Sequence, residues 1–144
     1  MTRRGSGVRI PSGPPDETPG SPAGFANFGR SRNDARARAE LAAAREVGAR
    51  VSIPSVVVAE TVRGTAKDAA VNRVIKAVGE TMAFDEATGR VAGGLLGAIK
   101  SGSTLDAVVV ATAISVGGAV ILTGDPDDLG RIAAGHHEVL IEPL

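Results

Sequence analysis

Short apolar runs alternate with helical segments from residue 33 to the end of the chain, and this alternation limits the possible fold more than any other feature. The runs "ARVSI", "TMAF", "AVILT" and "EVLIEP" have the length of strands and are bounded by glycine, proline or polar turns. The segments between them are rich in alanine or carry apolar residues at helical spacing. Continuously apolar strands that alternate with helices are typical of a parallel sheet covered on both faces. The sequence therefore predicts an α/β fold, a three-layer sandwich with a mainly parallel sheet.

Capping residues set the bounds of the predicted elements. Asn33, Asp85 and Ser103 each precede a helical segment. The segment 55–64, "SVVVAETVRG", is ambiguous, because three consecutive valines favour a strand whereas Pro54 and Ser55 are typical of a helix start. The other predicted helices cover 34–47, 67–78, 86–100 and 104–115, with a helical turn after Pro126; the predicted strands cover 49–53, 81–84, 119–123 and 138–143.

The first thirty residues differ from the rest of the chain. They hold five of the eight prolines and have no periodic apolar face, which predicts a disordered segment over 1–30 and a folded domain over 31–144. The codons of "GVRIPSGPP" can spell the T-arm of a transfer RNA. We therefore hypothesise a reading frame that begins inside, or runs through, a neighbouring transfer-RNA gene.

Composition excludes several classes of protein. The 16 basic and 16 acidic residues cancel, so an extended basic surface for long nucleic acids is not expected. Aromatic residues make up 2% of the chain, too few for a sheet that stacks bases. The chain has no cysteine, which excludes disulfides and thiolate metal sites and fits the cytoplasm. No apolar stretch is long enough to predict a membrane span.

Three carboxylates stand beside apolar segments, and each also has an ordinary explanation. Asp125 follows "AVILT" and would fit a polar turn, in which Asp127 or Asp128 caps a short helix. Asp106 is the third residue after Ser103 and would fit a capping box. Glu60, taken alone, would fit the solvated face of a helix.

Taken together, the three carboxylates suggest a different explanation. Ligands of α/β folds bind at the carboxyl ends of the strands, where Asp125 falls. Charges on apolar elements are costly unless something compensates them, and clustered carboxylates repel one another. A hard divalent cation such as Mg²⁺, which prefers oxygen ligands, would compensate Glu60, Asp106 and Asp125 together.

The order "PSVVVAE", "STLDAVVVATA", "AVILTGDPDDL" resembles the PIN-domain ribonucleases, specifically the VapC toxins of bacterial toxin–antitoxin pairs. The resemblance covers the chain from Asn33 onward and implies a helix for the ambiguous valine segment. It implies Glu60, Asp106 and Asp125 as catalytic ligands of Mg²⁺ or Mn²⁺, with Asp128 sometimes counted with them. Ser55 and Thr123 match hydroxyl positions that support the cluster. The implied partners are an RNA substrate, a VapB-type antitoxin and a second copy in a homodimer.

The sequence departs from this family at one position. PIN domains begin with a central strand that ends in an Asp, which is the first metal ligand. Here the matching stretch reads "SPAGFANFGRSR", with Pro22 and Ala23 near the expected Asp. Asp16 stands in a proline-rich stretch that cannot form a buried central strand, and Asp34 fits the first turn of a helix. The first central strand and its Asp are therefore expected to be absent or replaced.

Two functions follow from these observations. The first is a VapC-like endoribonuclease whose activity the missing ligand would impair. The second is an inactive PIN-like remnant that binds an antitoxin or dimerises but does not cut. A phosphoacceptor receiver domain is excluded, because it needs an acidic pair after its first strand and a lysine after its last. Arg63 fits a surface arginine better than a phosphate contact, and His136 and His137 fit surface residues better than a general base.

Overall fold

The structure is a computed structural model that describes residues 7–11, 24–25, 32–100 and 102–144, with side chains from residue 35 onward. It places a helix at each of the predicted positions, and the predicted 81–84 strand is shorter than expected. The prediction of Asn33 as a helix N-cap is wrong, because α1 already begins at Arg32. The valine segment begins with a helix, as the family resemblance implied. The elements are β1 (Gly7–Pro11), β2 (Gly24–Phe25), α1 (Arg32–Glu46), β3 (Ala49–Pro54), α2 (Ser55–Thr61), the 3₁₀ turn η1 (Ala66–Asp68), α3 (Ala69–Val78), β4 (Thr81–Met82), α4 (Glu86–Ile99), α5 (Thr104–Ser115), β5 (Ala119–Thr123), α6 (Pro126–Ile132) and β6 (Val139–Pro143).

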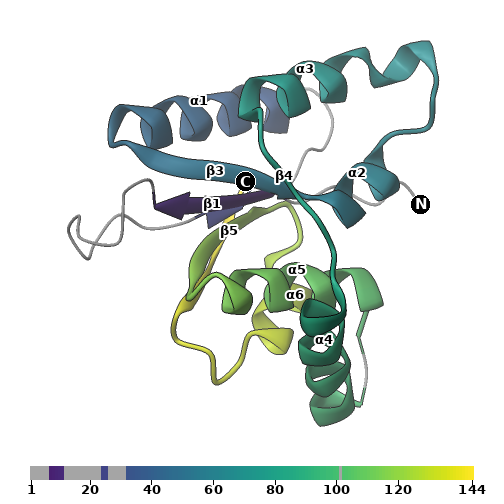
Figure 1. Cartoon of the computed structure of the whole chain (residues 1–144). Helices are drawn as coiled ribbons and strands as arrows, with labels where there is room; N and C mark the ends of the chain where they lie inside the picture. Colours follow the sequence, from purple (N-terminus) through teal and green to yellow (C-terminus); the bar gives the residue numbers. More distant parts are fainter. Residues whose placement is uncertain (1–6, 12–23, 26–31, 101) are drawn as a thin grey trace.

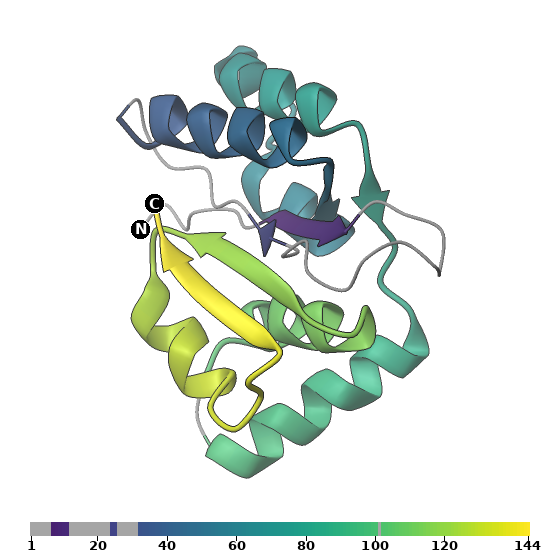
Figure 2. The same cartoon turned by 90° about the vertical axis from the view of Figure 1, so that its left-hand side faces the viewer.

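The sheet is mainly parallel, as predicted. β2 pairs parallel with both β3 and β5, β4 pairs parallel with β3, and β6 pairs parallel with β5. β1 is the exception, because it runs antiparallel to β3 and β5. β4 therefore lies at one side of the sheet and β6 at the other, with β3 and β5 on either side of the centre (Figure 2).

The strands at the centre of the sheet correct part of the prediction that residues 1–30 are disordered and that the first central strand is absent. β1 and β2 both lie between β3 and β5, and Arg9 and Gly24 both stand opposite Val51 and Val120. Strands form at this position because the facing sides of β3 and β5 carry backbone N–H and C=O groups that need hydrogen-bond partners. Within the predicted segment 1–30, residues 7–11 and 24–25 are thus strands. The prediction of disorder for the remaining residues concerns a part of the chain outside the described residues.

Helices lie on opposite sides of the strands. Figure 1 shows α1 and α3 on one side, and α4, α5 and α6 on the other. α1 and α3 contact β3, whereas α5 contacts β5 and α6 contacts β6. α2 contacts both β3 and α5, so it links the two halves of the fold. No helix in the described part of the chain has the length and apolar character needed to cross a membrane.

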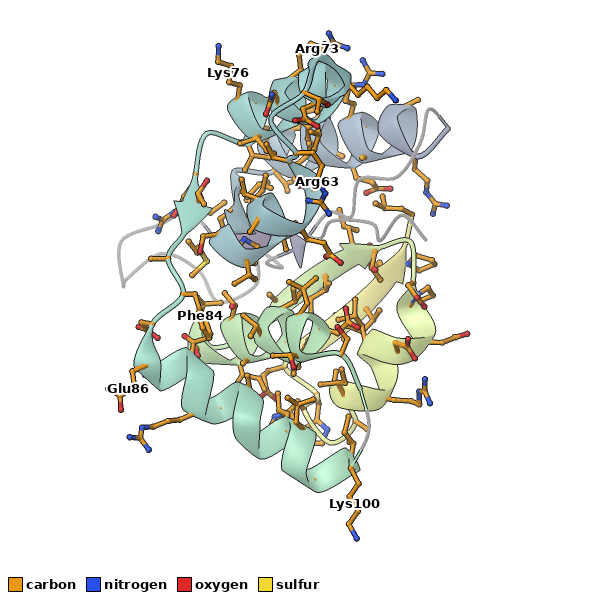
Figure 3. All side chains as sticks on the ribbon, turned by 90° about the vertical axis from the view of Figure 1, so that its right-hand side faces the viewer. Arg63, Arg73, Lys76, Phe84, Glu86 and Lys100 are labelled. Atoms are coloured by element: carbon orange, nitrogen blue, oxygen red, sulfur yellow. The ribbon has the colours of Figure 1, made fainter. Side chains whose placement is uncertain are left out.

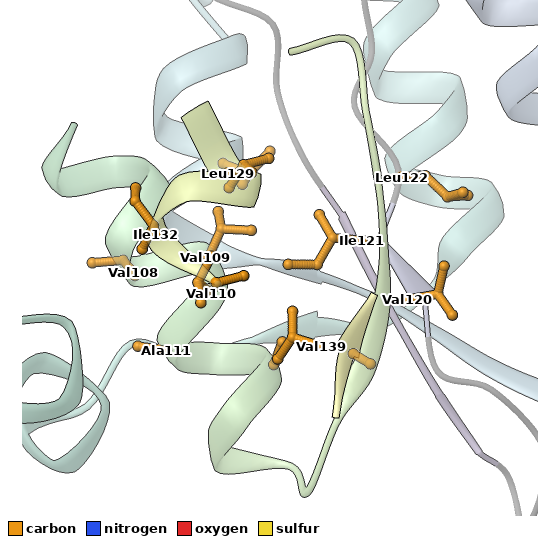
Figure 4. Packing of buried hydrophobic residues seen from close by; sticks show 14 of the residues in the cluster. Val108, Val109, Val110, Ala111, Val120, Ile121, Leu122, Leu129, Ile132 and Val139 are labelled. Carbon is orange, nitrogen blue, oxygen red and sulfur yellow. The ribbon is translucent and has the colours of Figure 1, made fainter. Parts of the chain in front are cut away.

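The core is densest around α5 and β5. Residues 107–113 of α5 and 119–123 of β5 are all buried. Figure 4 shows Ile121 pointing toward Val109 and Leu129, while Val120 and Leu122 point to the opposite face of the strand. This alternation explains why "AVILT" is continuously apolar, since both of its faces are covered. The rigid pair of α5 and β5 fixes the two ends at which Asp106 and Asp125 stand.

Candidate functional site

Glu60 lies in the last turn of α2, directly after β3. α2 begins at Ser55 because Pro54 has the extended backbone of a helix N-cap, with φ −60° and ψ 135°. Val57 is 1% exposed and fixes the helix to the core. Glu60 is half-buried, and its Oε2 is a buried atom. The structure therefore places this carboxylate at the edge of the core rather than on the fully solvated face that would explain it as an ordinary surface residue.

Arg63 stabilises the end of α2 instead of projecting freely. Its Nη1 donates to the carbonyl oxygens of Ala59 and Val62, each at 3.1 Å. The last carbonyls of a helix have no partner within the helix, and a nearby cation is also favoured by the helix dipole. Arg63 thus holds the turn on which Glu60 stands, although its side chain is exposed.

Asp68 fixes the chain that follows α2. Its Oδ2 accepts the backbone N–H groups of Arg63 and Thr65, each at 2.9 Å. The bond from Thr65 and then that from Arg63 lower the pKa of the Asp68 carboxyl below its ordinary value of 3.8. Sequence reasoning missed this residue, yet "TAKD" has the spacing of a capping box, which the structure confirms at Thr65 and Asp68. Asp68 is a structural rather than a chemical part of this region.

Asp106 is the third residue of α5. Its backbone N–H donates to Oγ of Ser103 at 3.4 Å, so Ser103 is the predicted N-cap. The Asp106 carboxylate is half-buried in the first turn, where the positive end of the helix dipole favours an anion. α5 leads through Gly117 and Gly118 into β5. Because this connection is short, the first turn of α5 lies near the carboxyl end of β5.

Asp125 is the N-cap residue of α6 and follows the carboxyl end of β5. Its side chain makes no capping hydrogen bond, and it is exposed. Its backbone N–H instead donates to Oγ1 of Thr123 at 3.1 Å. Thr123 is fully buried, so this bond fixes the turn that carries Asp125 to the buried end of β5. The N-cap position of α6 is thus Asp125, and not Asp127 or Asp128, which the sequence had suggested as the cap and which lie in the first turn of the helix.

Asp128 and His136 have local partners. Asp128 forms an ion pair with Arg131 one turn further along α6. Nδ1 of His136 lies 3.2 Å from Oε1 of Glu138. A bond with the Glu138 backbone and then the bond from His136 lower the pKa of the Glu138 carboxyl. Neither contact places Asp128 or His136 in a shared site with the other acids.

The three predicted ligands stand on elements that meet at one edge of the sheet. Glu60 follows β3, Asp125 follows β5, and Asp106 begins the helix that packs on β5. Oxygen donors of this kind suit a hard divalent cation. In the part of the chain that the structure describes, however, no three His, Asp or Glu side chains form a group that could hold a metal ion. The donor chemistry therefore fits Mg²⁺ or Mn²⁺, but the described side chains do not form a site for the ion.

A comparison of the sequence with models of protein families shows to which family the chain belongs. The family model of the PIN domain matches residues 25–135, which is most of the chain. The chain belongs to the PIN-domain family. The comparisons with curated proteins and with solved structures found no match. Members of this family are typically metal-dependent nucleases, and this membership confirms the resemblance to PIN domains and the α/β fold that it implied.

This PIN domain departs from the family pattern at its first strand. β2, of which the structure describes Gly24 and Phe25, occupies the central position in parallel with its neighbours. The sequence from residue 18 to residue 33 contains no Asp or Glu. The strand in the central position therefore cannot be followed by the acidic ligand that the family resemblance implies.

Proposed function

We propose that this PIN domain is a ribonuclease of the VapC type, the toxin of a bacterial toxin–antitoxin pair, which cleaves RNA with Mg²⁺ or Mn²⁺ in the cytoplasm. In this proposal the helices on the two faces complete a three-layer sandwich. Glu60, Asp106 and Asp125 are the catalytic acids and metal ligands, and Asp128 supports them. A VapB-type antitoxin and a second copy of the chain are the proposed protein partners. The single observation that supports the proposal is that Glu60 and Asp125 follow the carboxyl ends of two strands that run the same way, while α2, which carries Glu60, contacts α5, which carries Asp106.

A second function has an observation of its own. The described carboxylates form no group that could hold a metal ion, and no acid follows the central strand. These facts favour an inactive PIN domain that retains protein contacts but does not cut RNA. Such a protein would bind an antitoxin or a second copy through surfaces that do not depend on the acids.

RNA cleavage separates the two functions. Purified protein is incubated with single-stranded RNA in Mn²⁺, in Mg²⁺ and in EDTA. For the ribonuclease we expect cleavage that EDTA stops and that falls on the order of a hundredfold in Glu60→Gln, Asp106→Asn and Asp125→Asn. Glu46→Gln is the matched control, because Glu46 is exposed at the end of α1 and precedes the opposite end of β3.

Calorimetry with Mn²⁺ alone gives a result that does not depend on catalysis. The ribonuclease proposal expects heat of binding in the wild type and in Glu46→Gln, and its loss in Glu60→Gln. Absence of cleavage and of Mn²⁺ binding in the folded wild-type protein would reject the ribonuclease and leave the inactive PIN domain. Cleavage that persists in Glu60→Gln would reject the proposed site.

A further inference from the structure

The charges of this chain are distributed unevenly along the sequence, although they cancel overall. Residues 61–79, which follow Glu60 directly, contain four basic residues and one acid. Residues 81–144 contain three basic residues and eight acids. The balance of 16 basic and 16 acidic residues therefore excludes an extended basic surface but not a local one. We call residues 61–79 the basic segment.

The carboxylate of the one acid in the basic segment, Asp68, is buried. Asp68 is 6% exposed, and its Oδ2 accepts the backbone N–H groups of Arg63 and Thr65. The four basic residues, by contrast, are all exposed: Arg63, Lys67, Arg73 and Lys76. The exposed charges of the basic segment are therefore all positive.

Most cations of the basic segment lack the acidic partners that exposed arginines have elsewhere. The ion pairs outside the segment join Arg50 to Glu80, Arg90 to Glu86 and Arg131 to Asp128. Among the described residues, no acid pairs with Lys67, Arg73 or Lys76. Arg73 and Lys76 lie on one side of α3, where like charges repel each other. An anion from outside the described chain would offset this repulsion.

The basic segment leads away from the candidate acids. Glu60 belongs to α2, which contacts α5, the helix of Asp106. The chain then continues through Arg63 and η1 to α3, which contacts β3. Figure 3 shows Arg63 between the two halves of the protein, whereas Arg73 and Lys76 lie at the end opposite α4. The cations thus mark a path that begins one turn after Glu60 and ends on α3.

We infer that the basic segment binds the sugar–phosphate backbone of an RNA strand whose scissile phosphate lies at Glu60, Asp106 and Asp125. The inference rests on the proposed ribonuclease function and adds the surface on which the uncut part of the strand lies. A row of phosphates fits better than a single anion, because the cations are spread from position 63 to position 76. Each Lys or Arg that neutralises a phosphate releases a counterion, and such contacts do not depend on base sequence.

Two further observations favour RNA as the ligand of the basic segment. The eight acids of residues 81–144 repel a phosphate chain, so the strand leaves the site on the side of α3. An RNA strand is favoured over an acidic peptide because the chain belongs to a family whose members are typically nucleases.

Fluorescence anisotropy with a short labelled single-stranded RNA in EDTA tests the binding without metal or cleavage. We expect Arg73→Gln/Lys76→Gln to bind on the order of tenfold more weakly than the wild type at about 0.1 M salt. The slope of log K against log salt should become shallower by about 1.4, which is about 0.7 for each lost phosphate contact. Arg90→Gln/Lys100→Gln is the matched control, because it removes the same charge from exposed residues of α4. Failure of the wild type to bind RNA, or equal affinities of the two double variants, would overturn the inference.

Glu60→Gln separates failure of this inference from failure of the ribonuclease. It should bind RNA in EDTA at least as tightly as the wild type and should not cleave it in Mn²⁺. In Mn²⁺, Arg73→Gln/Lys76→Gln should raise KM about tenfold and leave kcat within about twofold, because these contacts are equal in the ground and transition states. RNA binding through α3 without cleavage would reject the ribonuclease and keep the binding surface. Cleavage with an unchanged KM in this variant would reject the binding surface alone.

Poly-glutamate of the same length and charge as the RNA tests the chemical class of the ligand. We expect it to compete with RNA weakly, since it lacks the sugar–phosphate chain. Poly-glutamate that binds the wild type as tightly as RNA, and that loses affinity equally in Arg73→Gln/Lys76→Gln, would reject RNA and identify an acidic peptide as the ligand.

Discussion

The buried carboxylate of Asp68 fixes the segment that follows α2, the helix that carries Glu60. Asp68 accepts two backbone N–H groups from the turn between α2 and η1, while Arg63 donates to the last carbonyls of α2. These bonds satisfy backbone groups that the end of one helix and the start of the next leave unpaired. Thus the orientation of Glu60 depends on residues that have no chemical role themselves.

The Asp68 contact makes a prediction about pH. Because the pKa of Asp68 is lowered in the folded protein, its stabilising contribution is complete above the ordinary value of 3.8 and is lost as the pH falls through the folded-state pKa. Asp68→Asn should therefore lower Tm by a few degrees at neutral pH, and the difference from the wild type should shrink in strong acid. Thermal unfolding followed by circular dichroism measures this difference. A gap in Tm that is constant with pH would show that the charge of Asp68 does not matter.

Candidate acids could be named from the sequence, but their arrangement in space could not be predicted. Glu60, Asp106 and Asp125 were recognisable because each carboxylate adjoins an apolar element, where a charge needs compensation. Whether their oxygens converge depends on helix packing, and this is a sum of many contacts distant in sequence. The pairing of Asp128 with Arg131 is local, three residues apart, and could have been read from the sequence.

At the scale of elements, the turn from α5 to β5 sets the position of both Asp106 and Asp125. Gly118 has φ 118°, and a Cβ there would lie 2.6 Å from the carbonyl oxygen of Glu138. Gly117 has φ 83°, but a Cβ there would meet no described atom within 4 Å. Both glycines therefore have a positive φ, which a residue with a Cβ rarely adopts. Only Gly118 also lacks the space for a Cβ.

Alanine substitutions separate these two requirements. Gly117→Ala should lower the free energy of unfolding by about 1 kcal/mol, the cost of a left-handed backbone for a residue with a Cβ. Gly118→Ala should lower it by about 2–4 kcal/mol, because β6 must also move away from the turn. Urea denaturation of the two variants measures both values. Equal losses would show that the close approach to Glu138 is not what requires glycine at 118.

Local signals predicted most elements, and a non-local pairing was missed. The helices that begin after Asp85 and Ser103 follow from capping residues, whose hydrogen bonds are confirmed. The valine segment could not be resolved from propensity alone, because valine favours strands while the preceding proline favours a helix start. β1 was not predicted, because proline-rich composition indicates disorder and the need of β3 and β5 for a partner is a property of the assembled sheet.

At the scale of the whole molecule, the two halves of the protein meet at the strands between β3 and β5. On one side lie α1 and α3, and on the other lie α4, α5 and α6. α2 and the central strands connect them. Because Glu60 belongs to the β3 half while Asp106 and Asp125 belong to the β5 half, any convergence of the acids depends on this central connection.

A proline in β1 tests that connection. Val8 stands opposite Ser52 of β3 and Ile121 of β5, so Val8→Pro removes a backbone donor at the centre of the sheet. We expect Val8→Pro to lower the free energy of unfolding by about 1–3 kcal/mol beyond Val8→Ala, which keeps the N–H group. Hydrogen exchange should accelerate at residues 50–52 and 120–122 in Val8→Pro alone. If the proline and alanine variants exchange equally at these residues, β1 does not join the two halves, and the acids would have to be brought together without it.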